Sequence, residues 1–114
     1  MKAEHYTIAG RIHYLTFSCY KKLWLFKSPT LYSSFLENLV RAKQRRSFRL
    51  HGYVVMPNHV HMLIYPDQHE SISAILTAVK RPFSFEALNY LQNRWPEIHE
   101  KLRVNKGAKE VRRF

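Results

Sequence analysis

The sequence predicts an α+β fold in which one antiparallel sheet carries helices on one of its two faces. Short segments rich in β-branched and aromatic residues recur along the chain, and two longer segments place apolar residues at helical spacing. A short Pro-Asn connection separates two of the strand segments, which favours an antiparallel hairpin. The length of 114 residues suits one compact domain.

The first half of the chain predicts a strand followed by a long helix. Residues 11–20 are rich in β-branched and aromatic side chains and indicate a strand, and residues 21–27 form a basic and aromatic connector. Ser28 is a good N-cap and Pro29 suits the first helical turn, so a helix is expected to begin there. Its apolar spacing predicts one buried stripe, made of Leu31, Phe35, Leu36, Leu39 and Val40.

The middle of the chain predicts two strands and a second helix. Strands are expected at residues 48–56 and 59–65, on either side of the Pro57-Asn58 turn. Ser71 is the expected cap of the next helix, because a helical run of apolar residues follows it. The inner face of that helix is expected to consist of Ile72, Ile75, Leu76 and Val79.

The last third of the chain is expected to be interrupted. Pro82 removes a backbone donor, so the second helix should end or kink near Lys80 and Arg81. Further short helices are plausible at residues 83–93 and 96–103, and the run from Val111 to Phe114 resembles the opening of a strand.

The order of elements is therefore strand, helix, strand, strand, helix. This order is most of a ferredoxin-like βαββα(β) unit with an antiparallel sheet, in which the fourth strand is missing or incomplete. Such a unit carries both helices on one face of the sheet and leaves the other face available for a ligand.

The charge balance points to a polyanionic partner. Nineteen Lys and Arg residues stand against eight Asp and Glu residues, giving a formal net charge of +11, and nucleic acid is the usual partner of so basic a domain. The single Cys19 excludes an internal disulfide and cysteine-rich zinc modules. No apolar signal core and no run long enough to span a bilayer occur, so we expect a cytoplasmic protein without a membrane partner.

Two histidines two residues apart are the most informative feature. His59 and His61 lie on the predicted strand 59–65, and alternation along a strand puts both imidazoles on the same face. Val60, Met62 and Ile64 then point the other way, into the core. Two neutral imidazoles suit a divalent cation, although exposed polar residues on a sheet show the same spacing.

The residues around this pair resemble a known family. The run from Met56 to Leu63, Met-Pro-Asn-His-Val-His-Met-Leu, resembles the signature of the IS200-like (Y1) transposases and the related REP-associated tyrosine transposases, which are His-hydrophobic-His (HUH) endonucleases. The run Tyr14-Leu15-Thr16-Phe17 resembles the first strand of that family, and residues 72–80 resemble the helix that follows the signature. The resemblance covers roughly residues 12–80.

This resemblance implies a fold, a cofactor and a reaction. It implies a ferredoxin-like core, usually dimeric, in which His59 and His61 on a central strand bind Mg²⁺ or Mn²⁺. A tyrosine on a later helix attacks a phosphate of single-stranded DNA, which is often recognised through a neighbouring hairpin, and a 5′-phosphotyrosine link forms for strand transfer.

The tyrosine motif of the family has no match in this sequence. Residues 1–114 are therefore expected to form a single domain that corresponds to the N-terminal portion of the family, without its catalytic helix, and the family's nucleophile is expected to lie beyond Phe114. Within the chain, Tyr90 is the candidate nucleophile, although ordinary packing beside Leu88 and Leu91 is the favoured explanation for it.

Basic residues supply the candidate DNA contacts, because neutralisation of phosphate charge drives much of such binding. Tyr20 and Trp24 lie among lysines and are candidates for base stacking, although core packing also explains Trp24. The candidate DNA-binding residues are Arg41, Lys43, Arg45, Arg46, Arg49, Lys21, Lys22, Lys80 and Arg81.

Two other functions remain open at this point. One is a catalytically inactive DNA-binding remnant or regulator, which the missing tyrosine motif favours. The other is a ferredoxin-like RNA-binding domain, since this fold serves unrelated functions.

Overall fold

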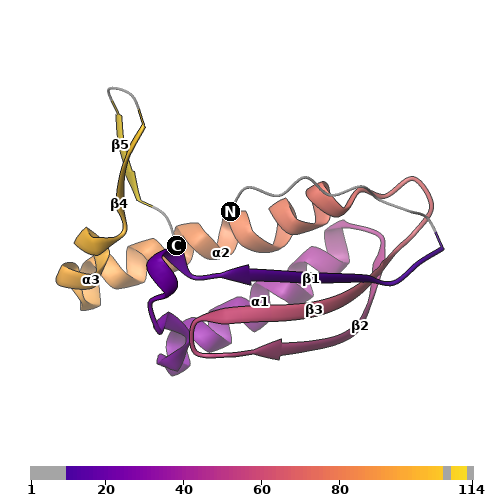
Figure 1. Ribbon diagram of the computed structural model, residues 1–114, viewed down its shortest axis with the longest axis horizontal. Coiled ribbons are helices and arrows are strands. Elements are labelled where there is room, and N and C mark those ends of the chain that lie inside the picture. Colours follow the sequence, from indigo (N-terminus) through magenta and orange to yellow (C-terminus); the bar gives the residue numbers. More distant parts are fainter. Residues whose placement is uncertain (1–9, 107–108, 113–114) are drawn as a thin grey trace.

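The computed structural model describes residues 10–106 and 109–112, and side chains are described for residues 10–102 (Figure 1). Within these residues, no helix has the length and apolar character needed to cross a membrane. The elements are β1 (His13–Ser18), η1 (Tyr20–Lys22), η2 (Leu25–Lys27), α1 (Pro29–Arg45), β2 (Phe48–Val55), β3 (His59–Pro66), α2 (Ile72–Arg94), α3 (Pro96–Lys101), β4 (Arg103–Lys106) and β5 (Lys109–Arg112).

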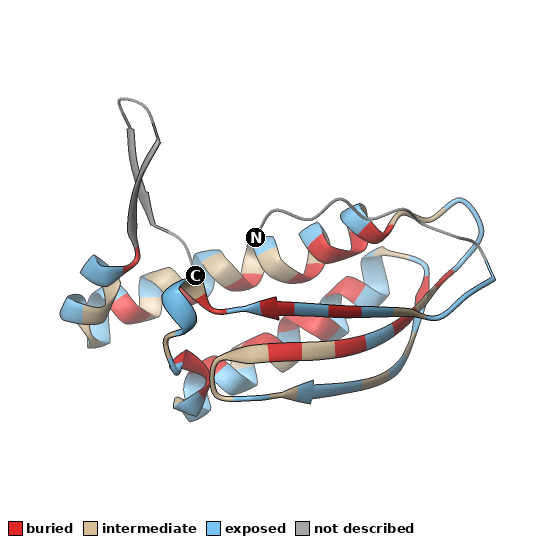
Figure 2. Cartoon of the chain, viewed as in Figure 1, coloured by how far each residue is buried: buried red, intermediate tan, exposed pale blue. Residues whose placement is uncertain are grey.

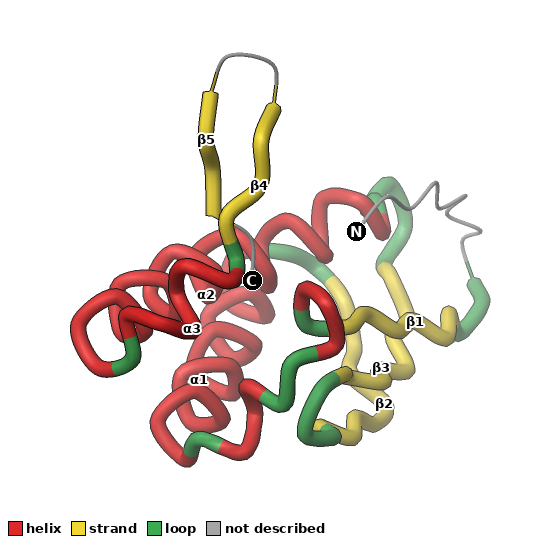
Figure 3. Tube along the Cα trace, turned by 60° about the vertical axis from the view of Figure 1, so that its left-hand side comes forward, coloured by secondary structure: helices red, strands yellow, loops and turns green. Residues whose placement is uncertain are grey.

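The main sheet has three antiparallel strands in the order β1-β3-β2, so the strand that carries both histidines is central as predicted. Helices α1 and α2 lie side by side and cover one face of this sheet (Figures 1 and 3). The three apolar residues between and after the histidines face these helices and are at most 1% exposed, namely Val60, Met62 and Ile64. The α+β class and the ferredoxin-like order of elements are thereby confirmed.

Strand β2 contains one extra residue relative to its partner. Leu50 pairs with Ile64 and Gly52 pairs with Leu63, so His51 is a β-bulge residue with no direct partner in the ladder. Residues opposite each other in an antiparallel pair share a face. Leu50 therefore faces the helices together with Ile64, whereas Gly52 faces the open side together with Leu63.

Helix α1 begins where the sequence predicts it. The Ser28 hydroxyl accepts a hydrogen bond of 3.3 Å from the Leu31 N–H, which satisfies one of the free donors of the first turn. The predicted stripe is wrong at one position, because Val40 is 57% exposed. The buried face is rotated toward α2 and consists of Leu31, Phe35, Asn38, Leu39 and Ala42.

Helix α2 does not end at Lys80 and Arg81 but continues through Pro82 to Arg94, so the expectation of an end there is wrong, and the helix expected at residues 83–93 is its second half. Pro82 has no N–H to give to the Ala78 carbonyl, which costs the helix one hydrogen bond. Tertiary contacts on the following turn offset this loss. Phe83 is 1% exposed, and Glu86 accepts hydrogen bonds from Asn38 (2.9 Å), Ser34 (2.9 Å) and Arg41 (3.1 Å) of α1.

The end of the chain also differs from the prediction. Strands β4 and β5 pair with each other in a separate antiparallel hairpin, and the strand expected to open at Val111 is the second strand of this hairpin. Arg113 and Phe114, the last two residues of that prediction, lie outside the described residues. The predicted short helix at 96–103 ends at Lys101, because β4 begins at Arg103.

Four phenylalanine rings join the sheet to both helices. Phe35 of α1 is fully buried, and its ring centroid lies 5.8 Å from that of Phe17 in β1, 5.5 Å from Phe26 in η2 and 5.3 Å from Phe83 in α2. Figure 2 shows the buried residues concentrated between the sheet and the helices. Cys19 belongs to the same core, and burial raises the pKa of its thiol to about 11, so it is protonated at neutral pH.

Glu70 links the end of α1, the start of β2 and the start of α2. Its side chain is only 8% exposed and forms an ion pair with Arg46. Its carboxylate also accepts hydrogen bonds from the backbone N–H groups of Ser47 (2.9 Å) and Ser71 (3.0 Å). Burial opposes ionisation, but these hydrogen bonds outweigh it and lower the pKa of Glu70 below its ordinary value of 4.5.

We expect the substitution Glu70→Gln to destabilise the fold by about 1–2 kcal/mol at neutral pH, because hydrogen bonds to a charged group are lost and Arg46 remains partly solvated. The folded pKa is lowered, so this contribution is complete above the ordinary pKa of 4.5 and disappears as the pH falls through the folded value. Urea unfolding of both proteins at neutral and acidic pH measures it. An equal loss of unfolding free energy at both pH values would contradict the assignment of this contribution to the ionised Glu70 carboxylate.

Candidate metal and nucleic-acid site

His59 and His61 project from the open face of the sheet, opposite the helices. Their ring centroids lie 4.7 Å apart and the ring planes are nearly perpendicular, at 86°. Both side chains are half-buried, so solvent reaches them while the neighbouring strands restrict their movement. The expectation that both imidazoles share one face is confirmed.

Each imidazole has an oxygen partner at the same ring atom. The Nδ1 atom of His59 lies 2.6 Å from the Asn58 Oδ1 atom, and the Nδ1 atom of His61 is hydrogen-bonded to the Tyr14 hydroxyl. Asn58 Oδ1 is an acceptor, so His59 donates through Nδ1 and keeps the lone pair on Nε2. The matching tautomer of His61 donates Nδ1–H to the Tyr14 oxygen. Metal-binding histidines commonly use one ring nitrogen in this way and ligate through the other.

The strand register explains why Tyr14 and the neighbouring residues meet the histidine pair. Thr16 of β1 and Val54 of β2 lie directly opposite His61, on its two sides. Tyr14 lies two residues before Thr16, on the same face, and its ring centroid is 5.6 Å from that of His61. A hollow of about 400 Å³ opens beside this pair, lined by Tyr14, Gly52, Tyr53, Val54, His61, Met62 and Leu63.

The donor set fits an open metal site. Among the described residues, no cluster of three or more His, Cys, Asp or Glu side chains is placed to hold a metal ion. The chain therefore offers two imidazole nitrogens, and water or phosphate oxygens would have to complete the coordination. Imidazole suits several transition metals, and Mg²⁺ is commonly held by few protein ligands.

Three of the basic residues predicted to bind DNA also contact the protein itself. Arg41 lies 3.1 Å from Glu86 and 3.9 Å from Glu37, and Arg46 pairs with Glu70. The Lys80 ammonium lies 5.1 Å from the centroid of the Phe17 ring on the helical side of the sheet. Lys43, Arg45 and Arg81 are exposed on α1 and α2, also on the helical side.

The remaining basic candidates lie closer to the histidine face. Lys21 and Lys22 follow the end of β1 in η1, are exposed and both have a φ of 55°. Arg49 lies opposite Tyr65 on the open face, with its guanidinium 5.9 Å from that ring. The DNA role of all nine basic residues stays a prediction, and these three are best placed for it.

Tyr90, the candidate nucleophile, lies on α2 on the helical side of the sheet. Hydrogen bonds from the side chains of Thr30 and Ser28 lower the pKa of its hydroxyl. Its ring packs edge-on against Trp95, with the centroids 5.8 Å apart. The structure does not bring Tyr90 together with the imidazoles, which project from the opposite face.

The expectation that the family's nucleophile lies beyond Phe114 stays a prediction. Phe114 is itself outside the described residues, so the structure places nothing at that end of the chain relative to the histidine pair. Among the described residues, Tyr14 is the tyrosine whose hydroxyl is bonded to an imidazole of the pair.

The sequence analysis did not predict that Tyr14 and Asn58 are the hydrogen-bond partners of the two imidazoles. Asn58 immediately precedes His59, and its polar side chain was a detectable local signal. Tyr14 is 47 residues away from His61 in the chain, so only the register of β1 against β3 reveals the contact.

Comparisons with known proteins agree on one family. Residues 7–107 match the family model described as transposase, IS200-like. The fold is similar to that of a REP-associated tyrosine transposase solved with a REP hairpin, at 22% identity and a TM-score of 0.61, over 73% of this chain and 50% of that one. This chain therefore spans half the length of that protein.

A second solved structure has the same fold. It is a Deinococcus radiodurans R1 protein assigned as a transposase, 15% identical, with a TM-score of 0.63 over 82% of this chain and 71% of that one. No curated protein matches the chain at a significant level.

Proposed function

We propose, from the premise that this chain belongs to the IS200-like transposase family, that it binds single-stranded DNA and holds a backbone phosphate beside a divalent cation at His59 and His61. Mg²⁺ and Mn²⁺ are the cations expected there. One observation carries the proposal: the two imidazoles are neighbours on the open face, and each has its Nδ1 atom engaged by an oxygen of the chain.

The residues around the pair prepare it for this task. Asn58 Oδ1 only accepts, so it favours the His59 tautomer whose Nε2 lone pair is free, and Tyr14 restricts the rotation of His61. When bound, the cation would polarise a phosphate oxygen and offset the charge that develops during attack on phosphorus. The net charge of +11 supplies the general attraction for a polyanion.

The open face offers a surface for an unpaired strand. Tyr14 is 61% exposed and Val54 53%, so an aromatic ring and an apolar group border the hollow beside His61. Bases of single-stranded DNA stack on such side chains, whereas a duplex keeps its bases inside. Lys21, Lys22 and Arg49 lie where they can contact the phosphates of the same strand.

The proposed reaction is a transesterification. A tyrosine oxygen forms a bond to phosphorus, and the bond between phosphorus and the 3′ oxygen breaks. The 3′ oxygen leaves as a hydroxyl after taking up a proton, and a 5′-phosphotyrosine remains. The total number of phosphate ester bonds is unchanged, so the step needs no external energy source.

The direct test is incubation of the protein with labelled hairpin-flanked single-stranded DNA in Mg²⁺, Mn²⁺ or EDTA. We expect cleavage and a covalent protein–DNA adduct that survives denaturing electrophoresis, only with the metal and only in protein that includes the tyrosine predicted beyond Phe114. DNA binding by that protein without any metal-dependent product would refute the proposed chemistry. Equal binding of RNA of the same sequence would favour the RNA-binding alternative.

A DNA-binding function without chemistry is the second candidate. The position of Tyr90 favours it, because its hydroxyl bonds to Ser28 and Thr30 on the side of the sheet away from the histidine pair. This candidate predicts affinity that falls steeply with salt and is indifferent to EDTA. The homodimer and the cytoplasmic location stay predictions.

Tyr14→Phe tests the role of the Tyr14 hydroxyl. We expect about tenfold weaker binding of Mn²⁺, because partners of a ligating imidazole are commonly worth that much or more. Isothermal titration with Mn²⁺ measures the change, and Tyr65→Phe is the matched control, since it removes a hydroxyl from another tyrosine on the same face of β3 as His61. Complete loss of the covalent adduct at saturating Mn²⁺ would instead identify Tyr14 as the nucleophile and contradict a positioning role.

A further inference from the structure

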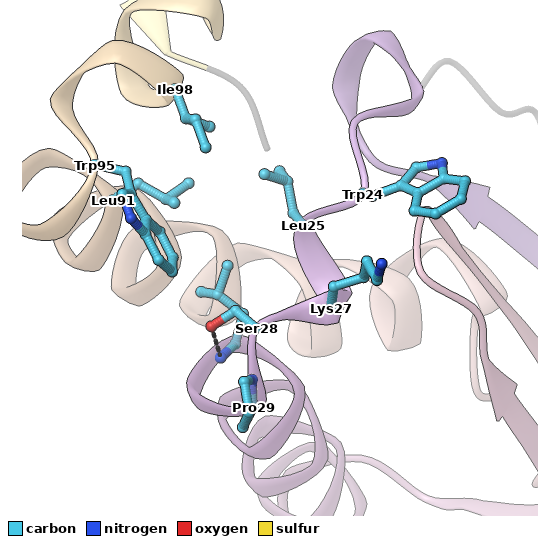
Figure 4. A pocket seen from close by; sticks show the side chains of 9 residues that line it. Trp24, Leu25, Lys27, Ser28, Pro29, Leu91, Trp95 and Ile98 are labelled. Atoms are coloured by element: carbon cyan, nitrogen blue, oxygen red, sulfur yellow. Dashed lines mark hydrogen bonds between the residues drawn. The ribbon is translucent and has the colours of Figure 1, made fainter.

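An apolar hollow of about 280 Å³ lies between η2, the start of α1, the end of α2 and α3. Both tryptophans of the chain are among its lining residues. In Figure 4 Trp95, Leu91 and Ile98 lie on one side and Leu25 on the other, and the Trp24 ring extends outward beyond Leu25. Ser28 and Pro29, at the start of α1, form part of its lower border. The hollow is separate from the one beside His61.

A cation accompanies each indole of this hollow. The Lys27 ammonium lies 5.0 Å from the centroid of the Trp24 ring, and the Arg94 guanidinium lies 5.5 Å from that of Trp95. Among the described residues that line the hollow, none carries a carboxylate, and Lys27 supplies the charge. Trp24 is 61% exposed, which is unusual for so large an apolar side chain.

The walls of the hollow are connected to the histidine pair through the backbone. The Phe26 N–H of η2 donates to the Pro57 carbonyl (2.9 Å), and the Cys19 N–H donates to the Asn58 carbonyl (2.9 Å). Residues 57–58 form the turn that leads directly into His59. Leu25 and Lys27 of the hollow therefore belong to a segment, η2, that is hydrogen-bonded to the turn before the histidine pair.

We propose that this hollow binds one unpaired nucleobase of single-stranded DNA, with Lys27 and Arg94 contacting the flanking phosphates. The inference rests on the proposed function, whose strand it extends. An apolar floor with aromatic walls suits the flat face of a base, and cations at the rim suit the backbone on either side. The floor of the hollow is apolar, so it offers no partner for the carboxylates of a peptide or of a second copy of the chain.

Intrinsic fluorescence reports on this site directly, because the only two tryptophans line it. The probes are an oligothymidylate of about ten nucleotides and an abasic oligomer with the same phosphates, titrated in EDTA. We expect fluorescence quenching by the oligothymidylate and about tenfold tighter binding of it than of the abasic oligomer.

Two variants at one position separate base binding from charge. Ile98 is half-buried in the wall, so Ile98→Phe fills the hollow and Ile98→Ala removes part of the wall. Both are expected to abolish most of the tenfold preference while the abasic oligomer binds as before. Lys27→Gln should weaken binding of both oligomers, and Lys101→Gln, at an exposed lysine of α3 that does not line the hollow, is its matched control.

The variant carrying both His59→Ala and His61→Ala distinguishes this inference from the proposed function. It should keep the base preference in EDTA, because the hollow does not use the imidazoles. If wild-type protein shows no metal-dependent cleavage yet loses its base preference in Ile98→Phe, the hollow stands and the proposed chemistry fails.

Three results would overturn the inference. The first is equal affinity of wild-type protein for the oligothymidylate and the abasic oligomer. The second is an unchanged preference in both folded Ile98 variants, with folding checked by circular dichroism. The third is a fall in mass by light scattering on Ile98→Phe with the preference retained, which would make a second copy of the chain the occupant.

Discussion

In protein that includes the tyrosine predicted beyond Phe114, replacing both His59 and His61 by alanine is expected to reduce metal-dependent cleavage of single-stranded DNA by roughly 100- to 1,000-fold, because the charge that develops on the phosphate then lacks its main stabilisation. Each single variant is expected to lose nearly as much, since one imidazole cannot hold the cation. Initial rates with labelled hairpin-flanked DNA in Mn²⁺ measure the loss, and titration with Mn²⁺ should show that binding at this site is gone.

The neighbouring strand offers a matched control for this experiment. His51 is an exposed imidazole at the β-bulge of β2, and its ring centroid lies 6.1 Å from that of Tyr65. His51→Ala should leave Mn²⁺ binding and cleavage close to wild type. DNA binding in EDTA should survive in the double variant, because phosphate contacts do not need the cation. A double variant that cleaves at the wild-type rate would show that the cation lies elsewhere.

Phe35→Ala is expected to destabilise the fold by about 3–5 kcal/mol, which is a large share of the roughly 5–15 kcal/mol that holds a domain together. Phe35 is fully buried and contacts rings from β1, η2 and α2, so its removal leaves a cavity that three different elements would have to fill. Backbone packing at their junction prevents complete collapse. Urea unfolding followed by circular dichroism measures the loss.

The same chemical change at an exposed position provides the comparison. Phe85 of α2 is 72% exposed, so Phe85→Ala should change the unfolding free energy by no more than about 0.5 kcal/mol. If both variants lost similar stability, the phenylalanine cluster would not be the junction of the core.

Local signals in the sequence were sufficient for most of the fold. Ser28 and Ser71 cap their helices as predicted, because capping depends only on residues three positions away. The alternation around His59 and His61 predicted which residues enter the core, since that alternation follows from the strand alone. The central position of β3 was implied by the resemblance to the IS200-like transposases.

Features that depend on distant residues were not predictable in this way. Pro82 stays helical because α1 binds Glu86 and the core buries Phe83, and neither contact is visible in the local sequence. Val40 is exposed because α2 meets α1 on the side of Asn38 and Ala42. The Tyr14 contact with His61 requires the register of two strands that are far apart in the chain.

The second hollow illustrates the same limit. The sequence indicated Trp24 and its lysines as candidates for base stacking, but Trp95 and Ile98 come from the far end of the chain. Their meeting with η2 depends on α2 continuing past Pro82, which the sequence analysis had expected to fail. An error about one proline therefore also hid a candidate site.

The extra residue in β2 has a consequence for how the length of this strand can vary. Leu50 and Gly52 already occupy consecutive ladder positions with opposite facing, so deletion of His51 would join them into a regular strand and leave every other side chain on its present face. Deletion of Val54 would instead move the side chains at one end of the strand to the opposite face of the sheet. Natural chains that differ by one residue in this strand should therefore differ at the position of His51.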